Sequence, residues 1–85
     1  MGAISILTDL PGPRSRALLE ERRRWVPAGV AEAKHGIFFE RAAGARLMDV
    51  DGNVFLDFAG GIGCLNAGHS NPRVLERARS QMDLL

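Results

Sequence analysis

GARLMDVDGNVFLDFAGGIGCLNAGHSNP, residues 44–72, is the stretch of sequence that decides the fold. Two extended runs, Arg46–Val50 and Val54–Phe58, flank the dipeptide Asp51-Gly52. This dipeptide between apolar runs predicts a β-hairpin with a type I′ turn, in which both central residues have positive φ. Because Leu47 and Asp49 share one face of the first run, that face is mixed, and we expect the strand near an edge or an interface.

A loop and a helix follow the hairpin directly. The loop, Ala59–Ser70, consists almost entirely of Gly, Ala and Asn with one His. Asn71 is a favoured N-cap residue, and Pro72 suits the first helical position. The helix that begins there carries one apolar face, formed by Val74, Leu75, Ala78, Met82 and Leu85.

The N-terminal part adds one helix and one strand. Residues 1–13 predict an irregular arm, and apolar residues spaced seven apart predict a helix over Arg14–Trp25 that ends at Pro27. A further extended run covers Ile37–Arg41. The expected fold class is therefore α+β: a helix, short antiparallel strands with a hairpin, a glycine-rich loop and a second helix.

Composition excludes several classes of function. The formal net charge is +1, so no bulk field attracts nucleic acid or anionic lipid. No apolar run is long enough to span a membrane, and the start lacks the features of a secretory signal, so a cytoplasmic protein is expected. A single cysteine, Cys64, allows no internal disulfide and no closed zinc site. With 85 residues and neither a disulfide nor a structural zinc ion, the chain is expected to depend on a partner or on a longer polypeptide.

The glycine loop admits more than one interpretation. A dinucleotide fingerprint is disfavoured, because Asn66 stands where the third glycine belongs and the helix starts too late. A tight connection between strand and helix needs only one or two glycines. Several glycines around the apolar Ile62 favour a backbone wall against a ligand or another subunit. Cys64 is expected to be a small hydrophobic residue and His69 a hydrogen-bonded turn residue, and neither is assigned a catalytic role.

Three elements of the sequence resemble a known family when they are taken together in order. They are Asp49-Val50-Asp51-Gly52, then Phe55-Leu56-Asp57-Phe58, then Asn66-Ala67-Gly68-His69-Ser70-Asn71-Pro72. This pattern resembles the N-terminal signature of class III aminotransferases, the ω-amino-acid transaminases that use pyridoxal phosphate. Residues 11–30 resemble the leader of the 4-aminobutyrate branch, so the resemblance covers about residues 11–85.

The resemblance implies a fold and an assembly. Residues 14–85 would be the N-terminal segment of the small domain of an α/β fold-type I enzyme, truncated at its C-terminal end. The whole enzyme would be a homodimer that moves the amino group of an ω-amino acid, 4-aminobutyrate first among the candidates, through pyridoxal 5′-phosphate to 2-oxoglutarate. Small amino acids and 2-oxo acids would be its ligands, with no nucleic acid or membrane partner.

The resemblance also implies which residues touch the substrate. Ile62, Gly60, Gly61 and Gly63 would line the substrate entrance, and an apolar Ile62 suits a simple ω-amino acid. No catalytic, cofactor-binding or metal residue is assigned. The lysine that forms the Schiff base lies downstream of this signature in the family, and Lys34 matches no such motif. The chain alone is therefore expected to be inactive and not to bind the cofactor.

A second hypothesis belongs to a different class. The chain could be a stand-alone, non-catalytic interaction module that docks on a partner, or on a full-length homologue, through its apolar helix faces and Trp25. Such a module would be monodisperse and melt cooperatively, whereas a severed segment would aggregate or remain largely unfolded.

Overall fold

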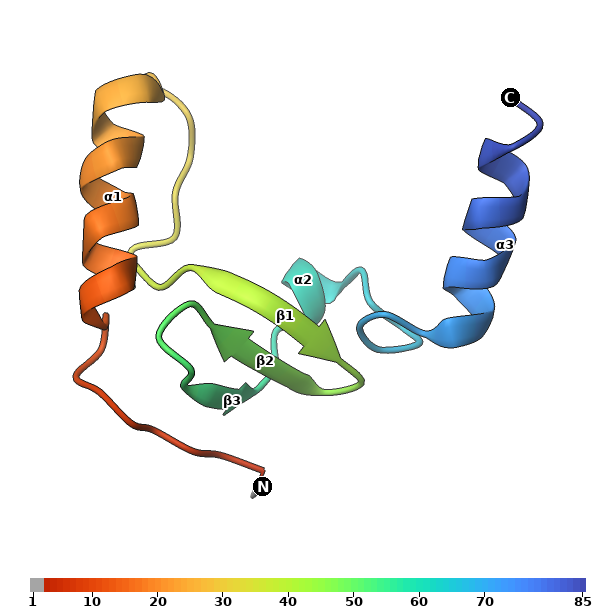
Figure 1. The fold of residues 1–85 in the computed structure, drawn as a ribbon, viewed down its shortest axis with the longest axis horizontal. Helices are drawn as coiled ribbons and strands as arrows, with labels where there is room; N and C mark the ends of the chain where they lie inside the picture. The colour runs from red at the N-terminus through yellow and green to blue at the C-terminus, as the bar shows by residue number, and fades with distance from the viewer. Residues whose placement is uncertain (1–2) are drawn as a thin grey trace.

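The computed structural model describes residues 3–85 and shows three helical segments and three strands (Figure 1). Their order is α1 (Pro13–Trp25), β1 (Phe39–Ala43), β2 (Arg46–Asp49), β3 (Val54–Leu56), α2 (Gly60–Gly63) and α3 (Pro72–Met82). The sheet forms the base of the molecule, and the two long helices rise from its opposite ends (Figure 1). The expected α+β class and order of elements are confirmed, with a short helical turn added inside the predicted loop.

The three strands form one antiparallel sheet in the order β1-β2-β3. β2 pairs with β1 through Phe39↔Asp49 and with β3 through Leu47↔Phe55. The sequence predicts β2 near an edge or an interface, and the edge alternative is wrong, because β2 is the central strand. β1 also starts two residues later than Ile37, since its bounds follow from this pairing, and its register shifts between Phe39 and Arg41.

The hairpin between β2 and β3 is confirmed, but its predicted type I′ turn is wrong. Gly52 has a φ of 86°, whereas Asp51 is not among the residues of positive φ. The amide of Gly52 donates to the carbonyl of Asp49 at 3.1 Å, and the amide of Asp49 donates to the carbonyl of Asn53 at 3.0 Å. The connection is thus a turn followed by a left-handed glycine. Asp51 keeps a negative φ, and its side chain binds backbone amides at the start of α1.

Asp49 and Asn53 explain why a polar residue sits in the central strand. Both are fully buried. The side-chain amide of Asn53 donates to Asp49 Oδ2 at 2.8 Å, and its Oδ1 accepts from the amides of Leu7 and Thr8 at 2.6 and 3.1 Å. Ser5 also forms a β-bridge with Val54, which is the buried apolar residue of the core. The N-terminal arm, predicted to be irregular, is therefore fastened to the sheet by backbone and side-chain bonds.

Helix α1 confirms the predicted helix to within one residue, and the hairpin caps it. The carboxylate of Asp51 accepts from the amides of Arg14 and Ser15 at 2.8 and 3.0 Å, which satisfies two free donors of the first turn. Ser15 is fully buried, and its hydroxyl accepts from the amide of Phe38 at 3.1 Å. At the other end, Arg22 forms an ion pair with Glu32 at 2.7 Å, which ties the C-terminal part of α1 to the connection that follows it.

Helix α3 begins as predicted and leaves its apolar face uncovered. Asn71 Oδ1 accepts from the amides of Arg73 and Val74 at 3.0 and 3.3 Å, and Pro72 occupies the first turn. No residue of the helix is buried. The apolar face predicted for this segment is exposed at Val74 (57%), Leu75 (36%), Met82 (75%) and Leu85 (103%), the last lying beyond the helix end.

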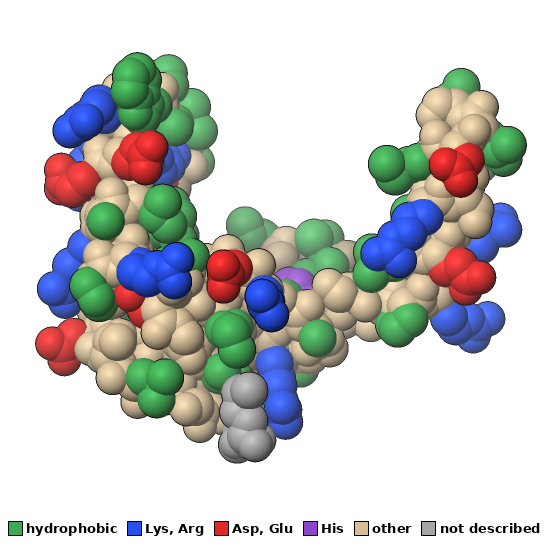
Figure 2. Space-filling model, viewed as in Figure 1, with side chains coloured by type: hydrophobic (Ala, Val, Ile, Leu, Met, Phe, Trp, Pro, Cys, Tyr) green, Lys and Arg blue, Asp and Glu red, His purple; other side chains and the backbone are tan. Residues whose placement is uncertain are grey.

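The chain leaves far more surface exposed than a compact protein of its mass. Its accessible surface is 6821 Å², against about 4,900 Å² for a folded monomer of this mass. The radius of gyration is 15.2 Å, against about 12 Å for a compact chain of this length. Figure 2 shows the reason, because α1 and α3 stand apart with an open hollow between them and apolar side chains on both. Among residues 3–85, no helix is long and apolar enough to cross a membrane.

Candidate functional site at the glycine turn

The loop between β3 and α3 contains a single turn of unusual hand. All four residues of α2 have positive φ: 56° at Gly60, 63° at Gly61, 61° at Ile62 and 79° at Gly63. Gly61 and Ile62 also have ψ values of 39° and 47°, which place them in the left-handed helical region. Within the turn, the amide of Gly63 donates to the carbonyl of Ala59 at 2.8 Å. Glycine adopts this conformation at little cost, which accounts for three of the four residues.

Ile62 is the exception in this turn. The left-handed region costs an L-residue about 1–2 kcal/mol, and a β-branched side chain is among the least suited to it. No burial compensates, since Ile62 is 98% exposed. Backbone strain without a local stabilising contact is typical of functional positions, where surrounding groups hold the conformation.

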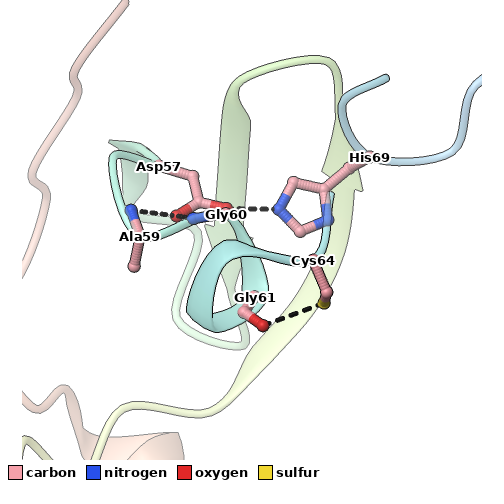
Figure 3. Close-up of polar contacts among 6 residues, drawn as sticks. All are labelled: Asp57, Ala59, Gly60, Gly61, Cys64 and His69. Carbon is pink, nitrogen blue, oxygen red and sulfur yellow. Dashed lines mark hydrogen bonds and ion pairs between the residues drawn. The ribbon is translucent and has the colours of Figure 1, made fainter. Parts of the chain in front are cut away.

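Asp57 and His69 hold the two ends of this loop together (Figure 3). Nε2 of His69 lies 2.6 Å from Oδ2 of Asp57, and it carries the proton because a carboxylate only accepts. Oδ1 of Asp57 accepts from the amides of Ala59 and Gly60 at 3.0 and 2.9 Å. The His69 hydrogen bond, together with the amides of Gly60 and Ala59, holds the pKa of the Asp57 carboxyl below its ordinary value. Asp57 is therefore an ionised anchor for the start of the turn.

The backbone ties the same two residues to the tip of the β1–β2 hairpin. The amide of Asp57 donates to the carbonyl of Ala45 at 2.8 Å. His69 and Gly44 form a β-bridge, with N–H···O distances of 3.0 and 2.9 Å. Gly68 permits this approach, because a Cβ there would lie 3.1 Å from the Cα and carbonyl oxygen of Gly44. Residues 57–69 thus form a closed loop whose ends share one attachment point on the sheet.

The predicted substrate-binding residues Ile62, Gly60, Gly61 and Gly63 lie together on this one exposed turn. A mainly apolar hollow of about 420 Å³ lies beside it, between Cys64–Gly68 and the first turn of α3. Another hollow, of about 510 Å³, lies over β1 and β2 around Arg41 and Arg46. Ile62 lines neither hollow. A substrate wall at Ile62 would therefore need a second surface facing the turn.

Cys64 and His69, which have no assigned catalytic role, both form hydrogen bonds within the loop. Cys64 is exposed, and its thiol donates to the carbonyl of Gly61 at 2.9 Å across the turn (Figure 3). His69 is a hydrogen-bonded turn residue, as predicted. No group of three or more acidic, His or Cys side chains within residues 3–85 is placed to hold a metal ion.

The described residues do not match the needs of a pyridoxal phosphate site. Such a site requires a lysine amine for the Schiff base and an acidic partner for the pyridine nitrogen. Lys34 is exposed in the connection between α1 and β1. The acidic group in the loop, Asp57, already accepts from two amides and from His69. We assign this chain no step that involves the cofactor.

Sequence reasoning missed the two aspartates that organise the structure. The sequence indicates Asp51 as a turn residue and Asp57 as part of a motif, yet the first caps α1 and the second anchors the glycine turn. A local signal exists for Asp57, because an aspartate two or three residues before free amides forms an Asx turn. No local signal exists for Asp51, whose partners lie 36 and 37 residues away in sequence.

Comparison with protein-family models gives a match to a known enzyme family. The model of aminotransferase class-III matches residues 28–85, which is more than half of the chain. The match begins within the connection between α1 and β1 and includes the sheet, the glycine turn and α3. It therefore covers the whole candidate site.

Individual relatives agree with this family. The chain is similar to 4-aminobutyrate aminotransferase GabT of Escherichia coli, with 41% identity over 71 residues, 84% of this chain and 16% of the relative. The 5-aminovalerate aminotransferase DavT of Pseudomonas aeruginosa is 39% identical over 71 residues, with the same coverage. An alanine/serine racemase of Pyrococcus horikoshii is 30% identical over 80 residues, 94% of this chain and 17% of the relative. The chain thus spans about a sixth of the length of these relatives.

Proposed function

Because the chain belongs to the class-III aminotransferase family, we propose that it serves as the N-terminal, substrate-facing segment of a pyridoxal-phosphate-dependent aminotransferase. The observation that carries this proposal is the continuous family match over the sheet, the glycine turn and α3. The motif residues Asp57, Gly68 and His69 support it, since each has a defined structural task in holding the turn. In this proposal residues 14–85 belong to a small domain that the rest of the enzyme completes.

The proposed reaction transfers the amino group of an ω-amino acid to 2-oxoglutarate. Relatives named for 4-aminobutyrate and 5-aminovalerate favour a linear substrate with a terminal amine. Ile62 and its neighbours Gly60, Gly61 and Gly63 would form one wall of the substrate entrance. An exposed, strained apolar side chain suits this task, because it can exclude polar substituents from the methylene chain of the substrate.

The exposed surface favours a larger assembly around this segment. The excess over a compact monomer is about 1,900 Å², close to what one partner contributes to a large obligate interface. The apolar side chains of α3 and Trp25, which is 74% exposed, contribute to that surface. We propose that the remainder of the aminotransferase, as a homodimer in the cytoplasm, covers it and supplies the Schiff-base lysine and the cofactor site.

A graft tests the proposed function. Residues 11–85 would replace the matching segment of the E. coli 4-aminobutyrate aminotransferase, and transamination of 4-aminobutyrate with 2-oxoglutarate would be measured. We expect activity within about tenfold of the parent. Substituting Ile62→Ala in the graft should lower kcat/KM for the amino donor by about tenfold or more, the scale of lost apolar contacts. A soluble, cofactor-loaded graft without activity would contradict the proposal.

The alternative function is a stand-alone docking module, which the same uncovered apolar surface favours. Intact mass of the native polypeptide separates the two. A mass several-fold above 9.2 kDa supports the aminotransferase segment. A native mass of 9.2 kDa together with a monodisperse, cooperatively melting chain supports the module and contradicts transamination by this product.

A further inference from the structure

We propose that Asp57 and His69 are positioning residues that hold the left-handed turn Gly60–Gly63 in place and thereby fix the direction of Ile62. The expected change in substrate binding rests on the proposed function of Ile62. The expected change in the turn itself is independent of that function and can be measured without substrate.

The first step of the argument is the strain of the turn. Ile62 has a φ of 61°, which is costly for an isoleucine, whereas its glycine neighbours adopt positive φ at little cost. The side chain of Ile62 offers no compensating contact, because it is 98% exposed. Backbone bonds from Gly63 to Ala59 and from Cys64 to Gly60 close the turn locally, and the residues that flank it attach it to the sheet.

The second step is the geometry of those flanking residues. Oδ1 of Asp57 binds the amides of Ala59 and Gly60, where the left-handed stretch begins. Oδ2 of the same carboxylate binds His69, whose backbone pairs with Gly44 at the hairpin tip. One carboxylate thus connects the start of the turn to the sheet through two independent routes, its own backbone and the imidazole.

The third step is that the contact between Asp57 and His69 is separate from the core of the fold. The side chains of Asp57 and His69 are only 8% and 19% exposed, so the contact between them is largely shielded from solvent. Neither residue contributes to the buried polar cluster of Asp49 and Asn53. Loss of the pair should therefore release the turn and leave the sheet formed.

Hydrogen–deuterium exchange of the 85-residue chain tests this inference. Asp57→Ala and His69→Ala should raise exchange in peptides covering residues 59–65 by about tenfold, while peptides covering β2 and β3 keep their protection. Asp57→Asn should restore most of the protection, because its amide oxygen can still accept from Ala59 and Gly60 and its Nδ2 can donate to Nε2 of His69 once that ring carries its proton on Nδ1. Asp83→Ala, an exposed aspartate beyond α3, is the matched control and should change neither region.

Unchanged exchange at residues 59–65 in Asp57→Ala would overturn the proposal. Equal loss of protection in the sheet would also overturn it, because the pair would then be a general stabilising contact. In the grafted enzyme, Asp57→Ala should raise KM for the amino donor with a smaller effect on kcat. If exchange at residues 59–65 rises but KM is unchanged, the role of Ile62 in substrate binding is refuted. The positioning of the turn by Asp57 and His69 is then still supported.

Discussion

Replacing Asn53 with alanine should unfold much of the protein, although the residue lies far from the glycine turn. Asn53 is fully buried and joins the N-terminal arm to the β2–β3 hairpin. Its side chain accepts from the amides of Leu7 and Thr8, and it donates to the Thr8 hydroxyl and to Asp49. Alanine removes all four contacts at once.

The size of the effect follows from these contacts. A hydrogen bond contributes about 1 kcal/mol net, and one to a charged group about 1.5–3 kcal/mol. Three neutral bonds and one to the Asp49 carboxylate give a loss of about 4.5–6 kcal/mol. Domains of this length have a free energy of unfolding of about 4–13 kcal/mol. The substitution should therefore remove a large part of the total stability.

Urea unfolding followed by far-ultraviolet circular dichroism measures this change. Asn66→Ala is the control, since Asn66 is exposed, and its free energy of unfolding should stay within about 0.5 kcal/mol of the parent. Asn53→Asp keeps the acceptors but places a second carboxylate oxygen opposite Asp49, so it should destabilise the chain at neutral pH. An Asn53→Ala loss below about 1 kcal/mol would refute the assignment of this cluster as the centre of the fold.

Three other predictions concern the glycine turn. Ile62→Gly should stabilise the chain by about 0.5–1 kcal/mol in the same urea assay, because relief of left-handed strain exceeds the entropy cost of glycine; a destabilised variant would contradict the strain. Gly68→Ala should destabilise by about 1–2 kcal/mol, because its Cβ would press on the backbone of Gly44, whereas Gly29→Ala, with open space around it, should be neutral. The pKa of Asp57 is lowered in the folded chain, so its contribution is complete above the ordinary value of 3.8 and is lost as the pH falls through the lower folded pKa. Unfolding midpoints of the parent and of Asp57→Asn should therefore converge in acid, and a constant difference at every pH would refute this.

Features with a local cause could be predicted from the sequence. Pro72 marks the start of α3 because proline suits the first turn, and Asn71 caps that helix with its own side chain, whereas Pro13, placed in the arm by the sequence, is the first residue of α1. The hairpin follows from two apolar runs around Asp51-Gly52. The loop glycines predict a backbone wall, which stays a prediction, and their positive φ is a finding of the structure.

Features set by distant partners could not be predicted. The turn type depends on Asp51, whose carboxylate is occupied by the amides of Arg14 and Ser15. The central place of β2 depends on burial of Asp49 by Asn53 and the arm. The left-handed geometry of Ile62 contradicts its local preference, and the contacts of Asp57 and His69 act together with backbone bonds inside the turn to hold it.

The two long helices differ in where their first-turn amides find acceptors, and this difference decides which helix depends on the sheet. Asn71 caps α3 from within the same segment, so that helix can form and fray independently of the sheet. Helix α1 has no side-chain cap of its own at Gly12 and receives Asp51 from the hairpin, across 36 and 37 residues of chain. Isolated helices of about 12–15 residues are marginal in water. Helix α1 is therefore coupled to the hairpin, because opening the hairpin removes the acceptors of its first turn, and its helicity reports on the state of the sheet.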